Sequence, residues 1–232
     1  MVQSNLKIYL PSGTELPDSD DIPVDNEEQN LLPNILLFIL NTLWAERKDW
    51  FFGVDMGIYH PTALNPRVPI VPDAFLSLGV ERYKDGKPRR SYVVWEENDI
   101  PPTLALEMGS WSPGREYDEK REIYRKLGVL YYVVYNPNHW QRDRHQAFEV
   151  YKLIEGSYQL QIGEPFWMPE VGLGLGRYEG KVSDRAVELL GWFDKKGDRI
   201  LTSEEKADYL QTKSERLAAR LRELGEDPES LL

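Results

Sequence analysis

The sequence predicts an α/β protein of the α+β kind, with a mixed β-sheet flanked by helices and a separate helix at the C-terminus. Apolar residues recur at helical spacing near both ends of the chain, at about 26–48 and 203–224. Hydrophobic residues make up 41% of the 232 residues, enough to build a core. Between the two helices, segments of strand-like composition lie at 50–59, 70–78, 91–95, 103–109 and 129–135.

The elements after residue 100 have clear sequence boundaries. A helix is expected at 116–127, ended by Gly128, because glycine is the usual residue just past a helix. The following segment, 129–135, is apolar on both faces and is expected to be a central strand. A hairpin should follow, with strands at 148–154 and 158–162, and then further β-structure at 166–177, in which alternating glycines indicate a closely packed strand.

Three segments are predicted along the chain. Residues 1–25 are acidic and proline-bearing, which favours an N-terminal arm, and residues 26–200 form the main domain. In 203–224, apolar or small residues recur at alternating spacings of three and four, which is typical of a coiled-coil seam and predicts a homodimer as one outcome. A helix packed on its own domain is the alternative. The seam residues are Ala207, Leu210, Ser214, Leu217, Leu221 and Leu224.

Composition excludes several classes of site. The chain has no Cys, so disulfides, thiolate zinc sites and cysteine catalysis are ruled out. The N-terminus lacks the basic and apolar blocks of a signal peptide, and a cytoplasmic protein is expected. The net charge of −11 opposes the approach of nucleic acid, although arginines and lysines gather locally, as at Arg89-Arg90 and Arg125-Lys126.

Two acidic residues stand in apolar, strand-like surroundings. Side chains alternate along a strand, so Leu104, Leu106 and Met108 share one face and Glu107 lies on the other. A lone buried carboxylate costs several kcal/mol unless it is paired. Asp73, which follows Pro72 at the start of another strand, is in a similar position. If the two carboxylates meet, a hard cation such as Mg²⁺ or Mn²⁺ would remove their repulsion. Turn or salt-bridge roles remain the alternative for both.

The order of these segments resembles the Uma2 type of restriction endonucleases, a branch of the PD-(D/E)XK nuclease superfamily. The resemblance is carried by Pro72-Asp73, by Leu104–Ser110 around Glu107, by Asp118-Glu119-Lys120 with Tyr124, and by Gly128–Pro137. It covers about 68–137 and extends more weakly over nearly the whole chain. It implies a restriction-endonuclease-like core, with a mixed sheet of about four to five strands between helices.

The resemblance also implies site residues. It carries the metal-binding carboxylates onto Asp73 and Glu107. The lysine of the usual E-X-K pattern would fall at Gly109, where there is no charge; in this branch it moves to the following helix, which makes Lys120 the candidate, with Tyr124 on the same helical face. The supporting candidates are Glu28, as the carboxylate that many relatives add from the first helix, and Asp55.

The function that follows is a metal-dependent endonuclease. With Mg²⁺ or Mn²⁺ held by Asp73 and Glu107, a water would attack a DNA phosphodiester while Lys120 stabilises the developing charge. The alternative is a non-catalytic module that keeps the nuclease fold and assembles through its C-terminal helix. The acidic net charge and the missing lysine at position 109 favour this alternative.

Overall fold

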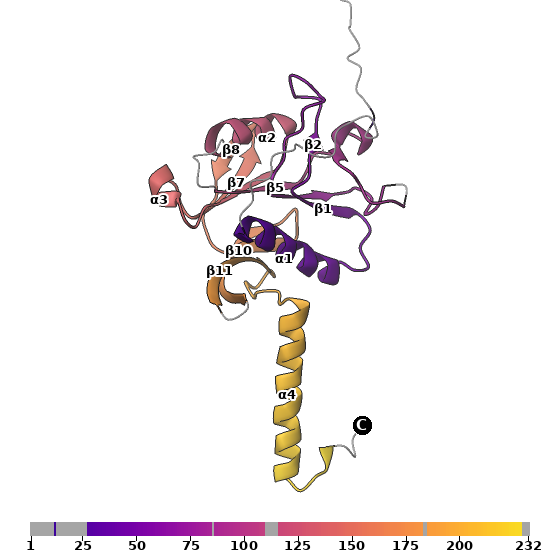
Figure 1. Ribbon diagram of the computed structural model, residues 1–232, viewed down its shortest axis with the longest axis vertical. Coiled ribbons are helices and arrows are strands. Elements are labelled where there is room, and N and C mark those ends of the chain that lie inside the picture. The colour runs from indigo at the N-terminus through magenta and orange to yellow at the C-terminus, as the bar shows by residue number, and fades with distance from the viewer. Residues whose placement is uncertain (1–11, 13–26, 85, 110–115, 183–184, 229–232) are drawn as a thin grey trace, which may run out of the picture.

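A computed structural model describes residues 12, 27–84, 86–109, 116–182 and 185–228 (Figure 1). The predicted arm, 1–25, lies outside the described residues except for Ser12. In chain order the elements are α1 (Glu27–Leu43), β1 (Trp50–Val54), β2 (Ile58–Tyr59), β3 (Ala74–Leu78), β4 (Tyr92–Val93), the short turn η2 (Val94–Glu96), β5 (Leu104–Met108), the π-helical turn η3 (Glu116–Lys120), α2 (Arg121–Leu127), β6 (Tyr131–Tyr135), α3 (Trp140–Asp143), β7 (Phe148–Ile154), β8 (Ser157–Leu160), β9 (Phe166–Met168), β10 (Leu173–Val182), β11 (Arg185–Phe193) and α4 (Ser203–Glu223).

A mixed sheet forms the centre of the fold, as the sequence predicts. Its strand order is β1-β3-β5-β6-β7-β8, so it has six strands in the described residues rather than four to five. Only β5 and β6 pair in parallel within this sheet, and the chain between them crosses one face of the sheet as η3 and α2. The two central strands therefore end at the same edge, beside the helix that connects them.

Two apolar cores lie on opposite faces of this sheet. On one face α1 packs with Leu104, Leu106 and Met108 of β5, and the small sheet β11-β10-β9 completes that core. On the other face α2 covers Ala105 of β5 together with Tyr132 and Val134 of β6. Figure 1 shows α1 and α2 on opposite sides of the sheet. The alternation predicted for β5 is confirmed, and it directs Glu107 toward α2.

The central strand β6 is buried on both faces, as predicted from its apolar sequence. Tyr132 and Val134 belong to the core under α2, whereas Tyr131, Val133 and Tyr135 belong to the core under α1. Because the sheet is covered on both sides, a polar side chain on β5 or β6 loses water unless it finds a partner within the protein.

Several boundaries differ from the sequence prediction; β3 begins at Ala74 rather than at 70, and β6 at Tyr131 rather than at 129. The expected strand 50–59 is interrupted at Asp55, whose φ of 45° is left-handed and ends the ladder. The first helix ends at Leu43 rather than 48, with Pro33 inside it. The long hairpin β10–β11 extends well beyond the strand predicted at 166–177. Close packing of its glycines is confirmed: a Cβ on Gly176 would lie 2.8 Å from Cα of Pro165.

The helix α4 extends away from the sheet domain (Figure 1). Thr202 caps its N-terminus in a capping box with Glu205, and none of its residues is buried. Among the described helices, none is both long enough and apolar enough to cross a membrane.

Candidate functional site

Asp73 and Glu107 face each other across neighbouring strands. In the antiparallel ladder Ala74 pairs with Leu106, so the next residues along, Asp73 and Glu107, lie opposite one another on the same face. Oδ2 of Asp73 accepts a hydrogen bond of 2.7 Å from the main-chain N–H of Met108, the residue after Glu107. Glu107 is only 1% exposed, whereas Asp73 is half-buried. The two carboxylates therefore converge at the edge of the covered face.

The helix that crosses this face supplies two partners for Glu107. Nζ of Lys120 donates to Oε2 of Glu107 at 2.6 Å, and the Tyr124 hydroxyl donates to Oε1 at 2.7 Å. Nζ of Lys120 also lies 3.3 Å from the main-chain oxygen of Val71. Lys120 ends the π-helical turn η3, and Tyr124 lies one turn later in α2. Such turns occur often at functional sites.

The electrostatics of the site are dominated by burial. Loss of water raises the pKa of Glu107 to about 8; the Lys120 ammonium opposes this shift, whereas the charge of Asp73 adds to it. Burial lowers the pKa of Lys120, but the attraction of Glu107 outweighs it and holds that pKa above its ordinary value. Burial raises the pKa of Tyr124 far above its usual range, so its hydroxyl stays a donor. Further positive charge would stabilise the Glu107 carboxylate.

The two supporting candidates occupy different places. The main-chain N–H of Asp55 donates to the main-chain oxygen of Asp73 at 3.1 Å, so its backbone adjoins the site, but its side chain is exposed. Glu28 belongs to the first turn of α1, which packs on the face opposite Glu107, and its side chain lies outside the described residues. The structure therefore brings Asp73, Glu107, Lys120 and Tyr124 together, whereas roles for Asp55 and Glu28 stay predictions.

Position 109, where the E-X-K pattern would place its lysine, has no room for a side chain. A Cβ on Gly109 would lie 2.3 Å from Cγ of Asn136 and 2.4 Å from its Oδ1. Asn136 is fully buried at the end of β6. In the sequence, Asn136 appears only within the segment Gly128–Pro137 that carries the family resemblance, and nothing there signals this contact.

A buried carboxylate on the same face also escaped the sequence reasoning. Val134 of β6 pairs with Glu107 of β5 on one side and with Glu149 of β7 on the other. Glu149 is 4% exposed and accepts from the Tyr151 hydroxyl at 2.7 Å and from the N–H of Gln146 at 3.0 Å. The sequence signal that could have found Glu149 is its position inside the strand predicted at 148–154.

The donor set of Asp73 and Glu107 fits a small, hard cation. Among the residues that the structure describes, no three His, Cys, Asp or Glu side chains gather as they would around a fully protein-ligated metal. Mg²⁺ does not need such a cage, because it retains several waters and binds through one or two carboxylates. The raised pKa of Glu107 has the same implication, since a cation would offset the cost of its buried charge.

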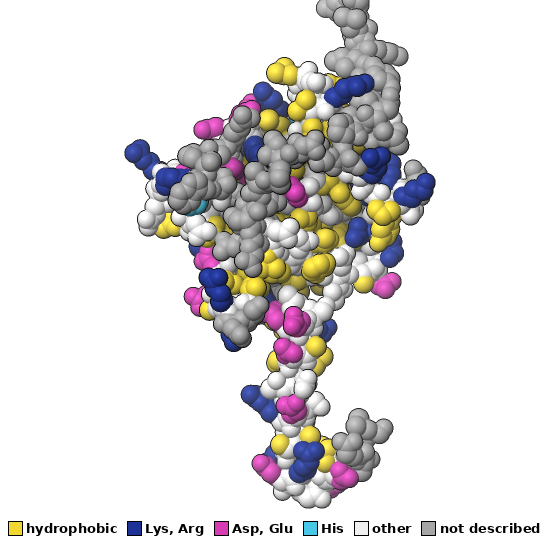
Figure 2. All heavy atoms as spheres, in the orientation of Figure 1, with side chains coloured by type: hydrophobic (Ala, Val, Ile, Leu, Met, Phe, Trp, Pro, Cys, Tyr) yellow, Lys and Arg dark blue, Asp and Glu magenta, His cyan; other side chains and the backbone are white. Residues whose placement is uncertain are grey.

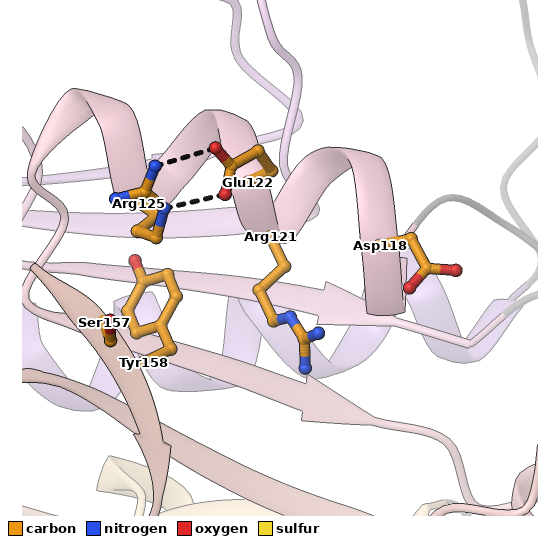
Figure 3. Close-up of a pocket in the computed structure, with 6 residues that line it drawn as sticks. All are labelled: Asp118, Arg121, Glu122, Arg125, Ser157 and Tyr158. Atoms are coloured by element: carbon orange, nitrogen blue, oxygen red, sulfur yellow. Dashed lines mark hydrogen bonds and ion pairs between the residues drawn. The ribbon is translucent and has the colours of Figure 1, made fainter.

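A separate depression lies between α2 and β8 (Figure 3). It encloses about 290 Å³, and Arg125 there forms a two-point ion pair with Glu122, with N–O distances of 2.7 and 2.8 Å. Arg121 points away from this pair (Figure 3). Because Asp118 and Glu122 balance the two arginines, the depression has no net positive charge that would favour a phosphate.

Comparisons with known proteins identify the family of this chain. The model of the Uma2 family, described as "Putative restriction endonuclease", matches residues 22–181, which is more than half of the chain. A crystal structure of a "putative nuclease belonging to DUF820" from Anabaena variabilis aligns with 63% of this chain and 74% of its own, at 12% identity and a TM-score of 0.44. No curated protein matches the sequence. The chain belongs to the Uma2 family of restriction-endonuclease-like proteins.

Proposed function

We propose that this protein is a metal-dependent endonuclease that hydrolyses phosphodiester bonds in DNA. One observation carries the proposal: Asp73 and Glu107 converge on one face of the sheet, with the Lys120 ammonium 2.6 Å from Glu107. Membership in a family described as restriction endonucleases supports it. DNA is the substrate class of restriction endonucleases, and its phosphates are the groups on which a cation and a lysine would act.

Asp73 and Glu107 would hold Mg²⁺ or Mn²⁺. When bound, the cation would polarise a phosphoryl oxygen and acidify a water. Lys120 keeps its proton, because its pKa is raised, and can stabilise negative charge that develops on the phosphate. Tyr124 donates to Oε1 of Glu107 and so fixes the orientation of that carboxylate. The half-buried Asp73 is the carboxylate that faces the open edge of the site.

Removal of the Asp73 carboxylate should eliminate both metal binding and DNA cleavage. We expect Asp73→Ala to reduce heat release on titration with Mn²⁺ to background, and to reduce nicking of supercoiled plasmid in Mg²⁺ or Mn²⁺ by about a hundredfold or more.

Glu170→Ala is the matched control for the Asp73 variant. Glu170 is an exposed carboxylate that pairs with Lys152 at 2.7 Å, and its second partner, Tyr131, belongs to the core on the opposite face. This control should bind Mn²⁺ and nick DNA like the wild type. Nicking by Asp73→Ala at the wild-type rate would remove Asp73 from the mechanism, and absence of Mn²⁺ binding by the wild type would remove the metal.

A non-catalytic assembly module is the second candidate, and α4 is the observation that favours it. The helix buries none of its residues, and Leu210, Leu217 and Leu224 are 52%, 57% and 63% exposed. Figure 2 shows hydrophobic side chains among the charged ones along α4. A second copy of the chain, with its own α4 alongside, would cover this seam.

Sedimentation of the full chain tests the dimer. The wild type should show a concentration-dependent dimer, whereas replacement of Leu210 and Leu217 with Ala should leave a monomer with unchanged far-UV circular dichroism of the sheet domain. The matched control replaces the exposed Gln211 and Arg216 of the same helix, which lie outside the seam. A wild type that sediments as a monomer at every concentration would eliminate the assembly role of α4.

A further inference from the structure

The lysine of the candidate site comes from a turn that must be held in place from outside the site. Lys120 is the last residue of η3, and its amine reaches across to Glu107 on β5. In an E-X-K arrangement the lysine would instead project from the same strand as the glutamate, so the sheet itself would fix its distance. Here that distance depends on how η3 is attached to the sheet.

Two hydrogen bonds attach η3 to the sheet, at the residues that lie three and four positions before Lys120. The hydroxyl of Tyr132 on β6 donates to the main-chain oxygen of Glu116 at 2.6 Å. The side chain of Tyr117 accepts a hydrogen bond of 3.2 Å from Nδ2 of Asn136, at the end of the same strand. Both ties connect η3 to β6, which runs parallel to β5 and pairs with it from residue to residue.

Asn136 uses both polar atoms of its side chain in hydrogen bonds, one of which reaches η3. Besides Tyr117, its Nδ2 donates to Oδ2 of Asp143 at 2.8 Å, and its Oδ1 accepts from the N–H of His139 at 3.0 Å. Its side chain also lies directly over Gly109, the position that would carry the strand-borne lysine. A side chain at 109 and the Asn136 network therefore exclude each other.

An aromatic stack holds the other side of Tyr117. Its ring lies parallel to the His145 ring, with 3.7 Å between centroids and 7° between planes. Nδ1 of His145 forms a hydrogen bond of 3.1 Å with Oε2 of the buried Glu149. Glu149 also accepts from Gln146 and Tyr151, so the His145 ring has a fixed orientation.

We propose that Asn136 and the Tyr117–His145 stack are the positioning device that lets a helix-borne lysine, Lys120, serve this site in place of a strand-borne one. That Lys120 takes part in catalysis rests on the proposed nuclease function. Asn136, Tyr117 and His145 act through Lys120; loss of their contacts lets η3 shift, and a displacement of about 1 Å is enough to weaken catalysis strongly.

The position of Lys120 can be measured without any nuclease activity. An amine-acylating reagent and mass spectrometry give the acylation rate of Lys120 relative to Lys152, which is also ion-paired and is 23% exposed against 28% for Lys120. We expect this ratio to rise at least about threefold in Tyr117→Phe and in Asn136→Ala, because an amine that is no longer held against its buried carboxylate partner is more accessible to the reagent. In plasmid nicking, both variants should lower kcat with KM unchanged.

Tyr158→Phe is the matched control. Tyr158 packs against the same core, and its hydroxyl donates to the main-chain oxygen of Val129 at 2.7 Å rather than to a residue of η3. In the Tyr158→Phe variant, the acylation rate of Lys120 relative to Lys152 should equal that of the wild type. An unchanged ratio in Tyr117→Phe, or an equal rise in Tyr158→Phe, would overturn the proposal. A wild type that binds no Mn²⁺ and nicks no plasmid would overturn the nuclease function alone. The acylation ratio would still decide whether Asn136 and the Tyr117–His145 stack hold Lys120 in place.

Discussion

Replacement of Glu107 with Gln is expected to abolish DNA nicking while making the protein relatively more stable at high pH. Nicking should fall by about a thousandfold or more, equivalent to about 4 kcal/mol of transition-state stabilisation, because the uncharged amide cannot replace a carboxylate toward Mg²⁺. The amide has the same shape, and it still offers an oxygen to Lys120 or Tyr124, the present partners of Glu107.

The stability effect follows from the raised pKa of Glu107. Its pKa is about 8 in the folded protein, against an ordinary value of 4.5, so the folded protein keeps a proton that the unfolded chain releases. The resulting stability is fully present below about pH 4.5 and is lost as pH rises through 8. In total this amounts to a few kcal/mol, on the order of 1.4 kcal/mol per pH unit. The amide of the Glu107→Gln variant does not titrate, so this loss would disappear.

Thermal unfolding of both proteins at pH 5.5 and 8.5, without divalent cation, checks this. The Tm of Glu107→Gln minus that of the wild type should be several degrees greater at pH 8.5 than at pH 5.5, since about 2–4 °C corresponds to 1 kcal/mol for a chain of this size. Glu97→Gln is the control: Glu97 is a buried carboxylate ion-paired with Arg89 at 2.8 Å, outside the site. The Glu97→Gln variant should be less stable than the wild type and should retain nicking activity. A Tm difference that does not change with pH would refute the electrostatic argument.

Substitution of Gly109 with Ala is expected to destabilise the protein by about 2–3 kcal/mol, or about 5–10 °C in Tm. The new Cβ would lie 2.3–2.7 Å from three atoms of Asn136, which is buried and held by its own hydrogen bonds. The backbone at 109 cannot move away without breaking the bond from the N–H of Gly109 to the oxygen of Tyr135 at 2.8 Å, and the Asn136 side chain cannot rotate away without losing its hydrogen bonds. The same contact accounts for the absence of a lysine at 109.

A double-mutant cycle isolates this contact. Gly109→Ala should cost much less in an Asn136→Gly background, in which all three clashing atoms are absent, giving a coupling free energy of about 1 kcal/mol or more from chemical denaturation. Equal costs in both backgrounds would show that Gly109 is required for some other reason, such as its backbone conformation.

The order of elements and the faces of the strands were largely predictable from local pattern. Alternation along 103–109 assigned Glu107 to the face opposite Leu106, and Gly128 ended α2 with a φ of 86°, as expected for a glycine at that position. The split of β1 and β2 at Asp55 was not predictable, because many residues tolerate a left-handed conformation only when their surroundings require it. The length of β10–β11 was also missed, since its outer half is polar and exposed.

By itself, the sequence determined that Asp73 and Glu107 bring carboxylates to the sheet, although it missed Glu149, and that Lys120 and Tyr124 share one helical face. The periodicity of side chains along a strand or helix is a local property of the sequence, so it can be recognised without knowledge of the fold. Only the tertiary structure decided the strand register that sets Asp73 opposite Glu107, and the contact of Asn136 with Gly109 that leaves the lysine to η3. These depend on packing between segments far apart in the chain, which local pattern does not encode.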